Sequence, residues 1–153
     1  MKSRHAFSRR DLLFSMRLSE LGKYGQDTAV LWHEAIARRK DNYVSSAFHK
    51  FIESLRDVKD LTIWLDNCAG QNKNWTFFTM MLYIINNPSY NMDRIRLKYL
   101  EPAHSFMASD TAHDRIKKQM RRTGKLFDFR DIVEAVTAAK CKPVPMTHND
   151  FMD

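Results

Sequence analysis

The sequence predicts an α/β protein, one domain over residues 1–153 with a mixed β-sheet flanked by helices. The main evidence is that short apolar runs rich in β-forming residues alternate with longer segments of helical spacing. Helices between strands imply parallel pairing and right-handed crossovers, whereas the first two strands follow each other directly and form a hairpin. The strand directions are therefore mixed. A chain of this length buries enough surface to fold without disulfides.

The hairpin is predicted within residues 7–34. Residues 12–18 (LLFSMRL) and 28–34 (TAVLWHE) have the composition of strands. Gly22 and Gly25 indicate a turn in the long loop between them.

A helix and then a strand–helix–strand unit follow the hairpin. Asp41 or Asn42 is expected to cap the first helix. Residues 61–65 form a short apolar strand, and residues 72–86 form a helix that is apolar on nearly every side, which predicts deep burial. Residues 94–100 alternate between apolar and basic side chains, which is typical of an edge strand. The expected core side chains of the apolar helix are Trp75, Phe77, Phe78, Met80 and Met81.

Two helices and an extended tail complete the prediction. Ser109 is expected to cap a helix that runs to Arg122, and Gly124 is expected to end it. Asp128 is expected to cap the last helix. The tail from residue 141 contains two prolines and is expected to be extended. The inward residues of the last helix are expected to be Ile132, Val133 and Val136.

The composition is basic, with 25 Lys and Arg against 18 Asp and Glu and a net charge of +7. A basic surface attracts phosphates, so a nucleic-acid partner and a merely soluble basic protein are both open at this point. Cys68 and Cys141 form no metal-binding motif and suit a reducing compartment. The N-terminus does not resemble a secretory signal, and the longest apolar stretch is too short for a membrane span, so we expect no membrane partner.

Acids and amides gather where the 61–65 strand ends. Asp66 follows this strand, and Asp110 opens the helix after the next strand, so both are expected at the carboxyl rim of the sheet, where α/β folds bind ligands. Hard carboxylate oxygens suit Mg²⁺ or Mn²⁺ and two-metal phosphoryl transfer, and Asn67, Gln71 and Asn72 are expected to contact the sugar-phosphate backbone. The alternative is that these residues provide only turn and cap chemistry.

The motif DNCAGQNKN, residues 66–74, resembles the signature of an uncharacterised domain family derived from transposable elements. The family is thought to be an RNase H-like relative of DDE transposases. Four further blocks resemble the same family in the same order, so the resemblance covers nearly the whole chain. They are LWHEAIARR (31–39), HSFMASDTAHDRI (104–116), FDFRDIVEAV (127–136) and NDFMD (149–153).

The resemblance implies an RNase H-like fold with a three-acid metal site and a DNA-cutting and DNA-joining activity. An intracellular location is expected, in the nucleus rather than the cytoplasm. Asp66 matches the second acid and Asp110 the third, which makes them the expected catalytic and Mg²⁺- or Mn²⁺-binding residues. The first, central strand and its acid have no counterpart, since Asp11 falls on the wrong strand, and Pro102-Ala103 stands where the family usually has Pro-Gly. We therefore expect a domain shortened at both ends and catalytically incomplete; the alternative is a non-catalytic nucleic-acid-binding or scaffold protein.

A basic run follows Asp110, and residues 115–125 contain no acid. It is expected to contact a DNA backbone, and the alternative is a solvated helix face whose cations suit the helix C-terminus. The residues expected to contact nucleic acid in this run are Arg115, Lys118, Arg121 and Arg122.

Overall fold

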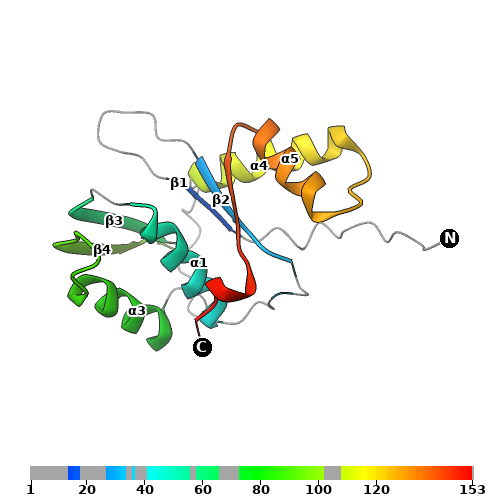
Figure 1. Ribbon diagram of the computed structural model, residues 1–153. Helices are drawn as coiled ribbons and strands as arrows, with labels where there is room; N and C mark the ends of the chain where they lie inside the picture. The colour runs from blue at the N-terminus through cyan, green and yellow to red at the C-terminus, as the bar shows by residue number, and fades with distance from the viewer. Residues whose placement is uncertain are drawn as a thin grey trace. The chain divides into compact units, whose positions relative to one another are not determined.

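The computed structural model describes residues 14–17, 27–33, 36, 41–55, 58–65, 73–101 and 108–152, with the side chains of 14–17, 41 and 108–110 left out (Figure 1). Helices and strands alternate as predicted, and the α/β class is confirmed. The chain forms two compact units: unit 1 is Met1–Arg38 with Phe106–His148, and unit 2 is Arg39–Ser105 with Asn149–Asp153. The elements are β1 (Phe14–Arg17), β2 (Asp27–Leu31), α1 (Asp41–Glu53), β3 (Asp60–Leu65), α3 (Trp75–Asn86), β4 (Arg94–Tyr99), α4 (Ala108–Thr123), α5 (Phe129–Ala138), β5 (Lys142–Pro145) and the 3₁₀-helix η2 (His148–Asp150).

The sheet of unit 1 has the order β1-β2-β5. The predicted hairpin is confirmed, because β1 and β2 pair antiparallel. The tail, expected only to be extended, instead forms β5 and pairs parallel with the other edge of β2. Met146 donates its N–H to the Leu31 carbonyl at 2.8 Å. Every second backbone nitrogen of a strand faces the same neighbour, so the backbone nitrogens of Pro143 and Pro145 face away from β2. Proline is tolerated there because the positions lie on an outer edge and need no N–H.

Helices α4 and α5 close the core of unit 1. Gly124 ends α4 with a φ of +84°, a conformation that favours glycine. Asp128 caps α5 as predicted, accepting the Asp131 N–H at 3.0 Å. The start of α4 differs, because Ser109 lies inside the first turn instead of at the cap. The buried cluster comprises Ala29, Leu31, Ala112, Ile116, Met120, Leu126, Ile132, Ala135, Val136, Ala139 and Cys141.

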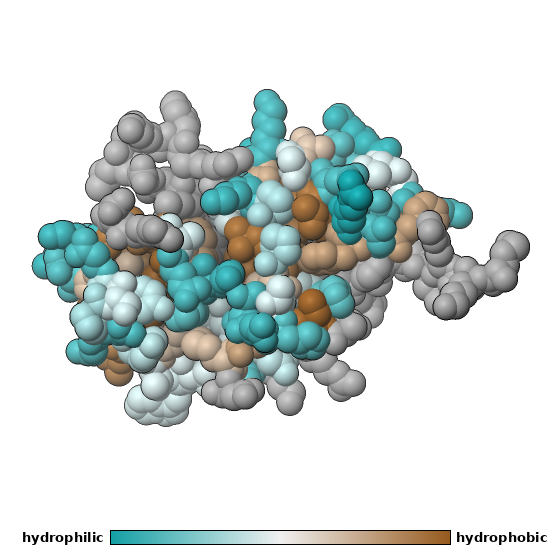
Figure 2. All heavy atoms as spheres, in the orientation of Figure 1, coloured by the Kyte–Doolittle hydropathy of each residue, from teal (hydrophilic) through white to brown (hydrophobic). Residues whose placement is uncertain are grey.

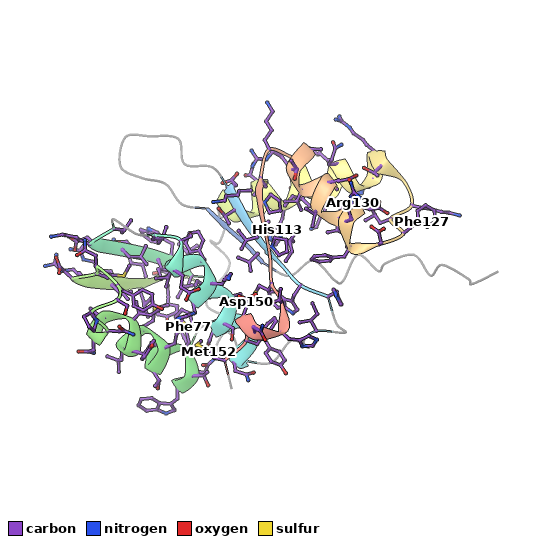
Figure 3. All side chains as sticks on the ribbon, in the orientation of Figure 1. Phe77, His113, Phe127, Arg130, Asp150 and Met152 are labelled. Carbon is purple, nitrogen blue, oxygen red and sulfur yellow. The ribbon has the colours of Figure 1, made fainter. Side chains whose placement is uncertain are left out.

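Unit 2 contains a strand–helix–strand unit, β3–α3–β4, with the two strands parallel from Asp60↔Arg94 to Leu65↔Tyr99. Helices α1 and α3 pack together, and the rings of Phe48 and Phe77 meet edge to face with 5.0 Å between centroids. The C-terminal segment joins this unit: Figure 3 shows Asp150 and Met152 near α1. The buried apolar side chains are Val44, Ala47, Phe48, Phe51, Ile52, Leu61, Leu65, Phe77, Met80, Met81, Ile84 and Met92.

The prediction that α3 is deeply buried is correct for one face of the helix and wrong for the other. Phe77, Met80 and Met81 are buried, but Trp75, expected in the core, is 83% exposed. The reason is the helical period: the buried residues lie on one face, which is the face that packs against the described residues of the unit. The other large exposed apolar side chains of α3 are Leu82, Tyr83 and Ile85.

A single mixed sheet was expected, but the described strands form two separate sheets. The edges of β2 are both occupied, by β1 and β5, and β3 and β4 pair with each other. The finer expectation of an RNase H-like sheet stays a prediction. Across the part of the chain that the structure describes, no helix is both long and apolar enough to cross a membrane.

Candidate nucleic-acid interface

The amphipathic pattern of α4 determines which of its side chains face solvent. Ala112, Ile116 and Met120 recur every four residues, are at most 4% exposed and belong to the core cluster of unit 1. Cations occupy the opposite side of the helix at the same spacing. They are Lys117, Lys118, Arg121 and Arg122, and all four are exposed. We call these four residues the basic face of α4.

Among the residues that the structure describes, the basic face is not neutralised by ion pairs, although the exposed Asp114 lies one helical turn before Lys118. Within the described ranges, none of its four cations forms an ion pair with a carboxylate. Lys125, just beyond Gly124, is also exposed and extends the positive charge. Figure 2 shows hydrophilic side chains over the helices of unit 1. Two of the cations, Arg121 and Arg122, lie in the last turn, where they also complement the negative end of the helix dipole.

Arg115 was predicted to contact nucleic acid together with this face, but its side chain has partners inside unit 1. Its guanidinium donates to Asp27 Oδ2 and lies 3.7 Å from Cys141 Sγ. The Asp27 side chain is only 11% exposed, so the pair ties α4 to the first residue of β2. We assign Arg115 a structural role within unit 1 and leave it out of the basic face.

Cys141, on the other side of Arg115, is a buried free thiol. Burial raises the pKa of this thiol, and the lowering influence of the Arg115 guanidinium does not offset the effect. A protonated thiol is a poor nucleophile and a poor metal ligand, so Cys141 is a core side chain.

The predicted acid and amide site falls largely outside the described residues, which exclude Asp66, Asn67, Gln71 and Asn72. Asp110 is placed by its backbone alone, in the first turn of α4. Asp66 belongs to unit 2 and Asp110 to unit 1, so the convergence of their carboxylates stays a prediction. The remaining described residues contain no group of three or more His, Cys, Asp or Glu arranged to hold a metal.

One part of that prediction has a structural counterpart in the strand pair of unit 2. Leu65 and Tyr99, the last residues of β3 and β4, are partners in the parallel register. Leu100 donates its N–H to the Leu65 carbonyl at 3.0 Å, which holds the two strand ends together. The carboxyl ends of both strands therefore lie at one edge of the sheet.

Sequence reasoning missed a second group of exposed side chains, on β3 and β4. The basic residues of β4 were predicted only to protect a sheet edge. In the structure, Lys98 Nζ lies 4.7 Å from the centroid of the Trp64 ring, and that ring is 53% exposed. The alternation of β4 in the sequence indicated that its cations are exposed, but the position of Trp64 opposite Lys98 depends on the register of the two strands.

We compared the chain with family models, curated proteins and solved structures, and found no match in any of the three. The resemblance to the transposase-derived family accordingly stays a prediction from the motifs.

Proposed function

We propose that this protein is a nucleic-acid-binding domain that contacts the phosphate backbone of DNA through the basic face of α4. The observation that carries the proposal is the set of four exposed cations on one side of a helix whose other side is buried. Cations that form no ion pair with a carboxylate are available to neutralise phosphates and release counterions. The resemblance to a transposase-derived family favours DNA as the partner.

The geometry suits backbone contact better than base readout. Lys117 and Arg121 are one helical turn apart, as are Lys118 and Arg122, so the four charges form two short rows along the solvent side of α4. Lys and Arg side chains contact the phosphate oxygens of DNA, and such contacts position a protein on DNA without reading the base sequence. We therefore propose binding that depends on salt and little on sequence.

The proposal is tested by removing charge from the basic face and, separately, from elsewhere in unit 1. The test variant is Arg121→Gln/Arg122→Gln, and the matched control is Arg130→Gln/Lys142→Gln, on α5 and β5 (Arg130 is labelled in Figure 3). Both double variants lose two exposed cations. Binding to a fluorescent DNA duplex is measured by anisotropy.

We expect the test variant to bind the duplex more weakly than the control, which should stay close to wild type. Equal losses in the two variants would show that net charge alone governs binding. Wild-type protein that does not bind the duplex at low salt would overturn the proposal outright.

A second candidate function, metal-dependent phosphodiester cleavage, is favoured by the shared edge where β3 and β4 end. Asp66 follows β3 directly, and its carboxylate and that of Asp110 are hard oxygen donors that suit Mg²⁺ or Mn²⁺. A bound divalent ion would supply charge neutralisation at the phosphodiester. The test is a thermal melt with and without Mn²⁺ beside Asp66→Asn, because a ligand that binds only the native state raises its stability. A rise in Tm in wild type alone supports the candidate, and equal curves reject it.

A further inference from the structure

The outer face of the β3–β4 sheet combines an aromatic ring with a row of cations. Along β3 the buried Leu61 and Leu65 point inward on the same side as the half-buried Ile63, so alternation directs Asp60, Thr62 and Trp64 outward. Along β4 the exposed residues alternate in the same way with half-buried apolar ones. The parallel register pairs Asp60 with Arg94, Thr62 with Arg96 and Trp64 with Lys98. We call these six residues the outer face of β3–β4.

Trp64 is the unusual member of this face. A tryptophan that is 53% exposed leaves a large apolar ring in contact with water, which favours a ligand that covers it. Lys98 Nζ lies over the ring, 4.7 Å from its centroid, in a cation–π contact that places positive charge at the aromatic face. A ligand that fits has a flat, polarisable group for the ring and a negative group for the lysine.

The cations of β4 extend this combination along the strand. Arg94, Arg96 and Lys98 occupy alternate positions, so their backbones are about 6.6 Å apart from one to the next. In the described ranges, Arg96 and Lys98 have no ion pair with a carboxylate, whereas Arg94 lies 3.5 Å from Asp60. The cations without an ion pair therefore lie at the Trp64 end of the strand, and cations next to a stacking ring are the combination that single-strand binding sites use.

We infer that the outer face of β3–β4 binds single-stranded DNA, with one base stacked on Trp64 and adjacent phosphates held by Lys98 and Arg96. Stacking on an exposed ring requires an unpaired base, because the bases of a duplex are already stacked on each other. The one carboxylate of the face, Asp60, lies 3.5 Å from Arg94, so it does not oppose the cations next to Trp64. The inference concerns unit 2 and does not depend on the basic face of α4.

The experiment measures the affinity of the whole chain for a short oligo(dT) and for a duplex of the same length. Trp64→Leu removes the ring, Trp64→Phe keeps an aromatic ring, and Trp75→Leu is the matched control because it removes an exposed tryptophan of α3. We expect Trp64→Leu to weaken oligo(dT) binding by about 5- to 150-fold. Trp64→Phe should retain most of the affinity, and Trp75→Leu all of it.

The duplex arm separates this inference from the proposed function. Trp64→Leu should leave duplex binding unchanged, and Arg121→Gln/Arg122→Gln should weaken duplex binding while leaving oligo(dT) binding in place. Arg96→Gln should reduce the salt slope for oligo(dT) by about 0.7, the value of one single-strand phosphate contact. Loss of duplex binding alone leaves the inference standing, and loss of oligo(dT) binding alone leaves the proposed function standing.

Four results would overturn the inference. The first is that wild-type protein does not bind oligo(dT). The second is that Trp64→Leu and Trp75→Leu weaken oligo(dT) binding equally while both variants melt like wild type. Tighter binding to polyglutamate than to oligo(dT) would assign the face to an acidic polypeptide. Tighter binding to oligo(rU) would assign it to RNA.

Discussion

The basic face of α4 makes a quantitative prediction about salt. Each phosphate neutralised on a DNA duplex contributes about −0.9 to the slope of log K against log salt. The four cations of the basic face therefore correspond to a slope of about −3.6, or about a 150-fold loss of affinity between 50 and 200 mM salt. The triple variant Lys118→Gln/Arg121→Gln/Arg122→Gln keeps only Lys117 and should lose about 3.5-fold over the same range.

The assay is a series of anisotropy titrations with a labelled duplex across this salt range. Cations elsewhere on the protein add equally to both slopes, so the predicted quantity is the difference, about 2.7. A variant with weaker binding but an unchanged slope would refute the reasoning, because phosphate contacts would not have been lost. Circular dichroism of both proteins confirms that α4 remains folded.

Three further predictions concern the framework. Asp128→Ala removes the N-cap of α5 and should lower stability by about 1 kcal/mol, or roughly 2–4 °C in Tm; an unchanged melt would contradict the cap. The buried Ser46 hydroxyl accepts the Met152 N–H at 2.9 Å, so Ser46→Ala should speed hydrogen exchange at that amide; an unchanged exchange rate would contradict this contact. Burial raises the pKa of Cys141, so its contribution to stability is complete below the unfolded thiol pKa, about 8.5, and is lost as pH rises through the native pKa. Cys141→Ala should flatten the fall in Tm above about pH 8.5, and a parallel fall would contradict it.

Local patterns were enough to predict most elements of the fold. The cap at Asp128, the stop at Gly124 and the alternation of β4 each have a local cause, so their predictions were correct. Strand pairing depends on distant residues instead. β5 contains two prolines and does not look like a strand, and it becomes one because it pairs along β2. The exposed side of α3 was missed because apolar composition does not show which face is covered.

In the candidate interface, too, local patterns predict some features and contacts between distant residues determine the others. The exposure of Lys118, Arg121 and Arg122 follows from the helical period of α4 and was predictable. Arg115 belongs to the same run of charge, but its partner Asp27 is 88 residues away in the sequence, and only the tertiary structure shows the pair. Trp64 was assigned to a short apolar strand, and its outward direction emerges from its position between the inward Ile63 and Leu65.

The most direct test of the central claim is the affinity of the wild-type chain for a DNA duplex of arbitrary sequence. The account predicts binding in the range of about 1 to 100 μM near physiological salt, tightening as salt falls and changing little with sequence. Absence of binding at 50 mM salt, or binding that is indifferent to salt, would contradict it.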